Sequence, residues 1–320
     1  MRAAQVKEFG GPEVLVPAEL PDPVPGPGEV LIDVAYADTI FVETQVRSGW
    51  GRDYFPVTPP YVPGGGVSGT VTAVGPEVPE HWLGRRVTSF VQGSYASRAV
   101  AGVSGLTAVP EDLDLLTAAA LVHDGVTAAG LMELTGVAAG ERVLVLGASG
   151  GMGTLLVQLA RGRGARVVGV ARGAEKLTLV RELGASAVVD ASDADWVARA
   201  REALGGAADV VLDGVGGELG AAAFALTADG GRFSAHGAPT GGFAALDGRE
   251  AERRGIRVFG IGDVQFDAAE RRRLASYALE EAAAGNLRAV VGEVFALERA
   301  GRAHAAVESR RLVGKVLLEC

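Results

Sequence analysis

The first hundred residues alternate short apolar runs with separators rich in glycine and proline. Each run has the β-branched and aromatic content of a strand, and each stops at a turn signal. The pattern therefore predicts a β-rich body with long loops. The predicted strands cover residues 2–9, 29–37, 67–75, 84–92 and 94–101. We expect the proline-rich segment 11–29 to be an ordered surface connection, because proline fixes φ and lowers the cost of ordering a loop.

The pattern changes near Asp114, where strand-like and helix-like segments begin to alternate. Residues 114–136 predict a helix with Asp114 or Thr117 as its cap. The strands that follow are apolar along their whole length, which is typical of a parallel sheet covered by helices on both faces. The middle of the chain therefore predicts a doubly wound α/β unit. Its predicted strands are 142–148, 165–171, 185–190, 208–215 and 231–238, and its predicted helices are 151–164, 174–184, 195–205 and 218–230.

The end of the chain is mixed again. Residues 269–285 predict a helix, 289–310 a strand followed by a helix, and 314–319 a last strand. With 320 residues the chain is long enough for about two domains.

Composition and charge narrow the function classes. The net charge of −9 and the pI of about 5.1 argue against nucleic-acid or anionic-membrane surfaces, which need clustered Lys and Arg. The chain has no apolar signal core and no run of about 18 apolar residues, so we expect neither export nor a membrane segment. Cys320 is the single cysteine, which makes a cytoplasmic location the default.

A glycine-rich turn follows the strand that ends near residue 148. Its sequence "ASGGMG" matches the dinucleotide motif G-x-G-x-x-G, with Ala148 in place of the first glycine. Glycine lets backbone N–H groups approach a pyrophosphate, and the helix N-terminus adds its positive dipole end. A purely structural turn is the alternative. The turn residues that we expect to bind cofactor are Ser149, Gly150, Gly151, Met152 and Gly153.

The end of the next strand distinguishes between cofactors. NAD sites usually place an acid there for the ribose 2′-hydroxyl, whereas Arg favours the 2′-phosphate of NADP. This strand ends in Ala171-Arg172, with Lys176 one turn later. Arg172 and Lys176 can both bind phosphate oxygens, so the sequence favours NADPH. In the alternative interpretation both are solvated surface residues.

Many short motifs, in their order and spacing, resemble one family. They include "FGGPEVL", "PDPVPGPGEVLIDV", "VRSG", "PPYVPGGGVSGTVTAVG", "GERVLVLGASGGMG", "DVVLDGVGG" and "AHAAVESRRLVGKVLL". Along nearly its whole length the chain resembles the zinc-independent medium-chain dehydrogenases/reductases of the quinone oxidoreductase (zeta-crystallin-like) branch. The resemblance implies an α/β fold, with a GroES-like β-rich catalytic domain of residues 1–118 and 258–320. It implies a doubly wound Rossmann domain with a parallel sheet at residues 119–257.

The resemblance also implies cofactor contacts and an assembly. It places Thr127 and Lys315 near the cofactor, and family members commonly form homodimers. Two further strand ends lie where open α/β sheets bind ligands, and their residues Val215, Gly216, His236 and Gly237 are expected to bind cofactor. Zinc members need a Cys or similar ligand near position 40 and a His-Glu after "PG". This chain has neither, so we expect no metal site.

The substrate end of the expected site departs from the family pattern. Family members typically carry Asn where this chain has Ile40 and Tyr where it has Gln45. Gln45 can still donate a hydrogen bond to a carbonyl. Arg47 is equally well explained as a structural residue that pairs with an acid as by a role in the site. We expect Ile40 to contact the substrate, together with Trp50 and Tyr54 from an aromatic loop.

The predicted activity is hydride transfer from NADPH to a quinone or another α,β-unsaturated carbonyl compound. Gln45 and His123 are the candidate catalytic residues, His123 as a proton donor after hydride transfer. A packed structural histidine is the alternative for His123. Two other functions stay open: an enoyl reductase acting on a polyketide or acyl intermediate, and an NADPH-binding protein without turnover.

Overall fold

The computed structural model describes all 320 residues, and they form two compact units. The first unit contains Met1–Val126, Asp267–Ala284 and Ala289–Cys320, and the second contains Thr127–Phe266 and Gly285–Arg288. The two ends of the chain thus build one unit and its middle builds the other. The predicted domain bounds at 118/119 and 257/258 rest on the family resemblance and stay a prediction.

A seven-stranded mixed sheet forms the body of the first unit, in the order β14-β15-β3-β4-β5-β7 with β6 paired to β3. β14 and β15 are parallel, and the other neighbours are antiparallel. A separate ribbon pairs β1 with β2, so the segment that the sequence predicts as a connection contains a strand. The strands are β1 (Arg2–Val6), β2 (Leu15–Glu19), β3 (Glu29–Asp38), β4 (Gly66–Val74), β5 (Arg86–Phe90), β6 (Arg98–Gly102), β7 (Thr107–Ala108), β14 (Val291–Ala296) and β15 (Lys315–Glu319).

The first unit also holds a helix in a stretch where the sequence predicts only strands and loops. This helix, α1 (Phe41–Ser48), begins where Glu43 accepts a hydrogen bond from the Ile40 N–H at 3.1 Å. It ends at Gly49, whose φ of +93° suits glycine. The prediction was wrong because the helix is short and buries polar side chains, which hides its apolar period. The other helices of this unit are α2 (Leu115–Leu121), α9 (Ala268–Ala283) and α10 (Ala300–Ser309).

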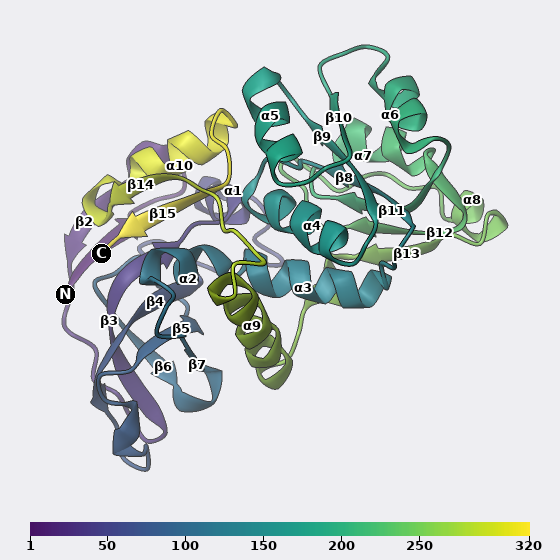
Figure 1. Ribbon diagram of the computed structural model, residues 1–320. Helices are drawn as coiled ribbons and strands as arrows, with labels where there is room; N and C mark the ends of the chain where they lie inside the picture. Colours follow the sequence, from purple (N-terminus) through teal and green to yellow (C-terminus); the bar gives the residue numbers. More distant parts are fainter. The chain divides into compact units, whose positions relative to one another are not determined.

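The second unit is a doubly wound α/β domain. Its six strands are all parallel, in the order β10-β9-β8-β11-β12-β13, and Figure 1 shows helices on both sides of this sheet. The strands are β8 (Arg142–Leu146), β9 (Arg166–Ala171), β10 (Ala187–Asp190), β11 (Ala208–Asp213), β12 (Thr227–Ala235) and β13 (Arg257–Gly260). The helices are α4 (Gly151–Gly162), α5 (Ala174–Glu182), α6 (Trp196–Leu204), α7 (Gly217–Phe224) and α8 (Gly248–Arg253). The predicted fold class is confirmed.

Two predicted helices have different bounds in the structure. The helix predicted over 114–136 is interrupted at Val122 and His123, which separates α2 from α3 (Asp124–Thr135) by a bend of 46°. The helix predicted over 218–230 ends at Phe224, because β12 already pairs with β11 from Thr227 onwards. In both cases tertiary contacts override the local pattern.

Five 3-10 helices cover Pro12–Val14, Glu80–Trp82, Val103–Gly105, Ile261–Val264 and Leu297–Arg299.

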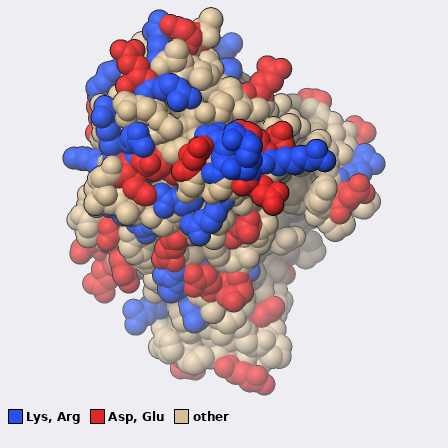
Figure 2. Space-filling view, turned by 90° about the vertical axis from the view of Figure 1, so that its right-hand side faces the viewer, with Lys and Arg blue, Asp and Glu red and all other residues tan.

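Positive and negative side chains are interspersed on the face that Figure 2 shows, so no broad area of one sign covers that face. No single helix has the length and hydropathy of a membrane span, although the bent pair α2 and α3 reaches both when taken together.

Candidate functional site

The second unit presents its ligand-binding edge where the strand order reverses, between β8 and β11. In open parallel sheets, ligands bind outside the carboxyl ends of the strands at this point. The two ends are close together here, since a Cβ added to Gly147 after β8 would lie 3.0 Å from the Val215 side chain after β11. The glycine turn and the "DGVGG" segment therefore share one edge of the sheet.

The glycine turn has the backbone geometry that a pyrophosphate cradle needs. Gly147 has a φ of +67°, and a Cβ on Gly153 would lie 2.1 Å from the Gly147 carbonyl oxygen. Gly150 is the N-cap of α4 and provides no side-chain cap, so the first N–H groups of the helix are open to an anion. Ala148 is fully buried and its N–H donates to the Val170 carbonyl at 3.0 Å. Its methyl group faces the sheet, which explains why alanine fits in this motif.

Two cations stand at the end of β9, beyond that turn. Arg172 is exposed and has no ion pair, and Lys176 is half-buried one turn into α5. Burial and the neighbouring Arg172 charge hold the pKa of Lys176 below its usual range. Asp190 lies near this pair but accepts hydrogen bonds from the Gly173 N–H at 3.0 Å and from Ser192. Two adjacent cations with this mutual repulsion suit a phosphate group.

The ends of β11 and β12 lie side by side. The Asp213 carboxylate accepts hydrogen bonds from the N–H groups of Val215 and Gly216, both at 2.9 Å, and shapes the turn. Burial raises the pKa of Asp213, whose second oxygen is buried without a hydrogen-bond partner. A Cβ on Gly237 would lie 2.2 Å from the Gly214 carbonyl, so glycine is required there.

His236 is buried beside that turn, with Nδ1 3.1 Å from the Ser234 hydroxyl. Burial lowers the pKa of His236 to about 4, so the ring is neutral at pH 7. The structure thus brings His236 and Gly237 together with the ends of β8 and β11. Thr127 lies half-buried in the first turn of α3. The glycine turn, the cation pair and these strand ends fit a dinucleotide phosphate.

A buried cluster of charged side chains lies in the first unit. Asp38, at the end of β3, has one oxygen 2.6 Å from His123 Nδ1 and the other 2.7 Å from the Lys315 ammonium. Asp124, at the start of α3, lies 3.2 Å from the same ammonium. Asp38 is fully buried, whereas the His123 side chain is 19% exposed. We name these four residues the Asp38 cluster.

The charges of the Asp38 cluster stabilise one another. Burial would raise the pKa of Asp38, but the Lys315 ammonium and the hydrogen bond to His123 outweigh it and hold that pKa below its usual range. The pKa of Lys315 is raised, because Asp124 and Asp38 outweigh its own burial. Burial raises the pKa of Asp124, and Lys315 offsets this only in part. An ionised Asp38 can only accept hydrogen bonds, so we assign a proton to His123 Nδ1 and leave Nε2 for exchange.

Two glycines and a phenylalanine confine the His123 ring. A Cβ on Gly65 would lie 3.1 Å from Nε2, and one on Gly66 would lie 3.0 Å from Nδ1. The Phe90 ring meets the imidazole edge-on, with 4.6 Å between the ring centroids. Glycine at positions 65 and 66 therefore leaves room for the histidine, since a side chain at either position would press against its ring.

A second buried polar cluster lies in the same unit. The Tyr95 hydroxyl donates to Glu43 at 2.5 Å and lies 3.0 Å from His304 Nε2. Arg47 lies 3.4 Å from His304 Nδ1 and forms an ion pair with Glu308 at 2.5 Å, which favours the structural interpretation of Arg47. Burial, only partly offset by the Tyr95 hydrogen bond, raises the pKa of Glu43 to about 7. Burial and the Arg47 charge lower the pKa of His304 to about 3.

The remaining predicted site residues lie on or near α1. Ile40 caps that helix, half-buried, and Gln45 is half-buried on it. Trp50 and Tyr54 follow the helix in an exposed loop, where Trp50 is 40% and Tyr54 81% exposed. The roles of all four in binding or catalysis stay predictions.

Sequence reasoning singled out His123 and Lys315 but missed the Asp38, Glu43, Tyr95 and His304 side chains as members of polar clusters. The partners lie far apart in the chain; 85 positions separate Asp38 from His123. No local spacing could show them. The one usable signal was Asp38 itself, a charged residue that follows the uncharged residues 34–37 at the end of its strand.

Two family models match this chain. Residues 26–111 match the family model of the alcohol dehydrogenase GroES-like domain, and residues 151–273 match the model of the zinc-binding dehydrogenases. A quinone oxidoreductase from Sus scrofa is 32% identical over 324 residues, which is 99% of this chain and 97% of the relative. The chain belongs to the medium-chain dehydrogenase/reductase family, in its quinone oxidoreductase branch.

Other proteins also match this chain along nearly its whole length. A 2-haloacrylate reductase from a Burkholderia species is 30% identical over 99% of this chain and 98% of its own length. A solved mycobacterial structure, complexed with NADPH, is 34% identical, covers both chains completely and has a TM-score of 0.92.

One of the two matching family models is that of the zinc-binding dehydrogenases, but this chain has no suitable set of zinc ligands. No group of three or more His, Cys, Asp or Glu side chains is placed to hold a metal ion. Asp38 and His123 bond to each other, and the Lys315 ammonium occupies the other oxygen of Asp38. A catalytic zinc needs about three protein ligands, so these residues do not fit one.

Proposed function

We propose that this protein is an NADPH-dependent oxidoreductase that reduces quinones or other α,β-unsaturated carbonyl compounds. The observation that carries the cofactor choice is the adjacent pair Arg172 and Lys176 at the end of β9, without an acid at the ribose position. The relatives named as quinone oxidoreductase and 2-haloacrylate reductase support the substrate class, as does the NADPH-bound neighbour.

The second unit would hold the cofactor. The turn from Ser149 to Gly153 would bind the pyrophosphate through backbone N–H groups, and Arg172 with Lys176 would bind the 2′-phosphate. Val215, Gly216, His236 and Gly237 would contact the cofactor from the neighbouring strand ends. A neutral His236 adds no charge there. Bound NADPH supplies the hydride, and the protein supplies position and electrostatics.

His123 is the proposed proton donor to the reduced substrate. Asp38 accepts a hydrogen bond from Nδ1 and so orients the ring, while Lys315 holds the Asp38 carboxylate ionised. The partly exposed ring then presents Nε2 for proton exchange with the substrate oxyanion or with water. Gln45 is proposed as a second hydrogen-bond donor to that oxyanion, and Ile40, Trp50 and Tyr54 as substrate contacts.

An acceptor panel tests this function. We expect the protein to oxidise NADPH in the presence of 9,10-phenanthrenequinone, and a 2-enoyl thioester tests the enoyl reductase alternative. Oxidation with the thioester alone would contradict the quinone assignment. Tight NADPH binding without oxidation by any acceptor would favour a binding protein.

Two variants test the residue roles in the same assay. Arg172→Ala should weaken the preference for NADPH over NADH by about tenfold or more, because a charge-assisted phosphate contact is lost. An unchanged preference would show that Arg172 is a surface residue.

His123→Gln should lower kcat by about 100-fold and remove a limb of the kcat–pH profile. A lower stability with an unchanged kcat would make His123 structural.

We also propose a homodimer, as the family resemblance implies, and a cytoplasmic location. Sedimentation equilibrium of the purified protein tests the assembly, and a monomer at micromolar concentration would contradict it.

A further inference from the structure

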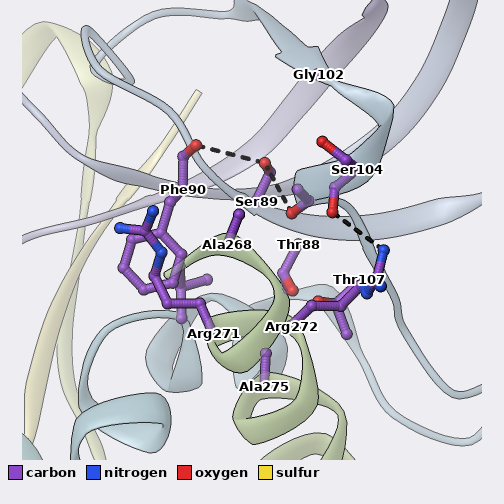
Figure 3. Close-up of a pocket in the computed structure, with 12 residues that line it drawn as sticks. Thr88, Ser89, Phe90, Gly102, Ser104, Thr107, Ala268, Arg271, Arg272 and Ala275 are labelled. Atoms are coloured by element: carbon purple, nitrogen blue, oxygen red, sulfur yellow. Dashed lines mark hydrogen bonds between the residues drawn. The ribbon is translucent and has the colours of Figure 1, made fainter. Parts of the chain in front are cut away.

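A pocket of about 230 Å³ lies in the first unit, between the β5, β6 and β7 region and the first turns of α9. Figure 3 shows its lining, in which α9 faces the hydroxyl-bearing residues of the sheet. Four of the lining residues carry hydroxyl groups, two are arginines and none is acidic. The hydroxyls belong to Thr88, Ser89, Ser104 and Thr107.

The two arginines of the pocket have no acidic partner. The Arg271 guanidinium lies over the Phe90 ring, 5.2 Å from its centroid. Arg272 donates to the Ser104 carbonyl at 3.2 Å. Figure 3 shows them reaching toward different ends of the pocket. The next arginine on α9, Arg273, instead forms an ion pair with Glu270 at 2.6 Å. Two successive arginines without carboxylates are unexpected in a chain of net charge −9.

Three of the hydroxyl-bearing residues that line the pocket are largely buried. Thr88 and Thr107 are 3% and 5% exposed, and both line the pocket. Ser89 is equally buried, and its hydroxyl reaches the Gly105 carbonyl only at a long 3.3 Å. Hydroxyl groups both donate and accept, so those that line the pocket can donate to a ligand or water inside it.

We propose that this pocket binds a phosphate-type oxyanion. Guanidinium groups supply forked donors that match such an oxyanion, and hydroxyls can donate to its remaining oxygens. The volume is below that of drug-sized ligand sites, which suits a single anionic group. The Phe90 ring contacts both Arg271 and the His123 ring, so the anion would sit one aromatic ring away from the Asp38 cluster.

The anion has two possible sources with the same chemistry: a free phosphate ion, or a phosphate group carried by the reducible substrate. The second source rests on the proposed reductase function, whereas binding itself does not.

Titration of the full-length protein with inorganic phosphate, at constant ionic strength, measures binding by calorimetry. We expect Arg271→Gln and Arg272→Gln each to weaken phosphate binding by about tenfold. Arg273→Gln removes the same charge outside the pocket and should leave it unchanged.

Equal weakening by all three variants would mean a general charge effect and would overturn the proposal, as would the absence of saturable phosphate binding. Arg271→Lys keeps the charge but loses the forked donor geometry, and its phosphate affinity should lie between those of wild type and Arg271→Gln.

The source of the anion is tested with a pair of enone acceptors that differ only in a phosphate group. If the phosphate belongs to the substrate, Arg271→Gln raises KM for the phosphorylated acceptor alone. If KM is unchanged while phosphate binding falls, the pocket binds a separate ion. A protein that reduces no acceptor would refute the proposed function, and the calorimetric test would still stand.

Discussion

The two polar clusters of the first unit each contain a histidine, and the two histidines differ in every respect that matters for chemistry. His123 bonds to an ionised carboxylate, Asp38, and keeps part of its ring exposed. His304 is fully buried beside the Arg47 guanidinium, and burial together with that charge lowers its pKa to about 3. Both clusters sit in the same β-rich unit, and neither follows a local motif.

The comparison shows that burial and the nearest charged partner together distinguish the two histidines. A carboxylate partner orients the ring for proton transfer, whereas a cationic partner keeps the ring neutral and structural. The carboxyl groups differ in the same way. Lys315 holds Asp38 ionised. Burial raises the pKa of Glu43 to about 7, because its only hydrogen-bond partners, a tyrosine hydroxyl and a backbone N–H, offset that burial only in part.

The largest effect is expected at the Asp38 cluster. Asp38→Asn should lower the free energy of unfolding by about 3–5 kcal/mol at pH 7, because it breaks a buried ion pair and leaves Lys315 with Asp124 alone. Urea denaturation measures this change. Asp33→Asn is the matched control, since Asp33 lies on the same strand and its side chain is 61% exposed. A loss below about 1 kcal/mol for Asp38→Asn would mean that the cluster contributes little to stability.

Glu43 should make stability depend on pH. Its folded pKa is raised, so its stabilisation is present below the unfolded pKa of about 4.5 and is lost as the pH rises through about 7. Glu43→Gln should therefore gain about 2–3 kcal/mol relative to wild type between pH 5 and pH 8. Chemical denaturation at both pH values tests this, with the exposed Glu8→Gln as control. A parallel pH dependence of Glu43→Gln and wild type would contradict the raised pKa.

His304 should act in the opposite direction and slightly less strongly. Its folded pKa is lowered, so its stabilisation is present above the unfolded pKa of about 6.5 and is lost as the pH falls toward about 3. His304→Gln should gain about 2 kcal/mol relative to wild type between pH 8 and pH 5. The exposed His81→Gln should not change this difference. If both histidine variants behave alike, His304 is not held neutral by its surroundings.

The glycine turn and the Rossmann sheet could be predicted from the sequence, because their determinants are local. The strand, the turn and the helix follow one another, and glycine is needed where Gly147 has a positive φ and Gly153 touches the backbone of the turn. Elements whose stability depends on distant contacts were missed or had different bounds. β2 forms because it pairs with β1, and the break between α2 and α3 places His123 against Asp38.

The sequence by itself determined the fold class and the place of the glycine turn, because each depends on residues close together in the chain, and it determined the family through the order and spacing of many short motifs. Only the tertiary structure decided which charges meet. Asp38 and Lys315 come from opposite ends of the chain, and β3 and β15 bring them together as neighbours in one sheet. The same packing leaves Arg271 and Arg272 without a carboxylate. Electrostatic energy depends on distance in space and on burial, and neither quantity is written in the local order of residues.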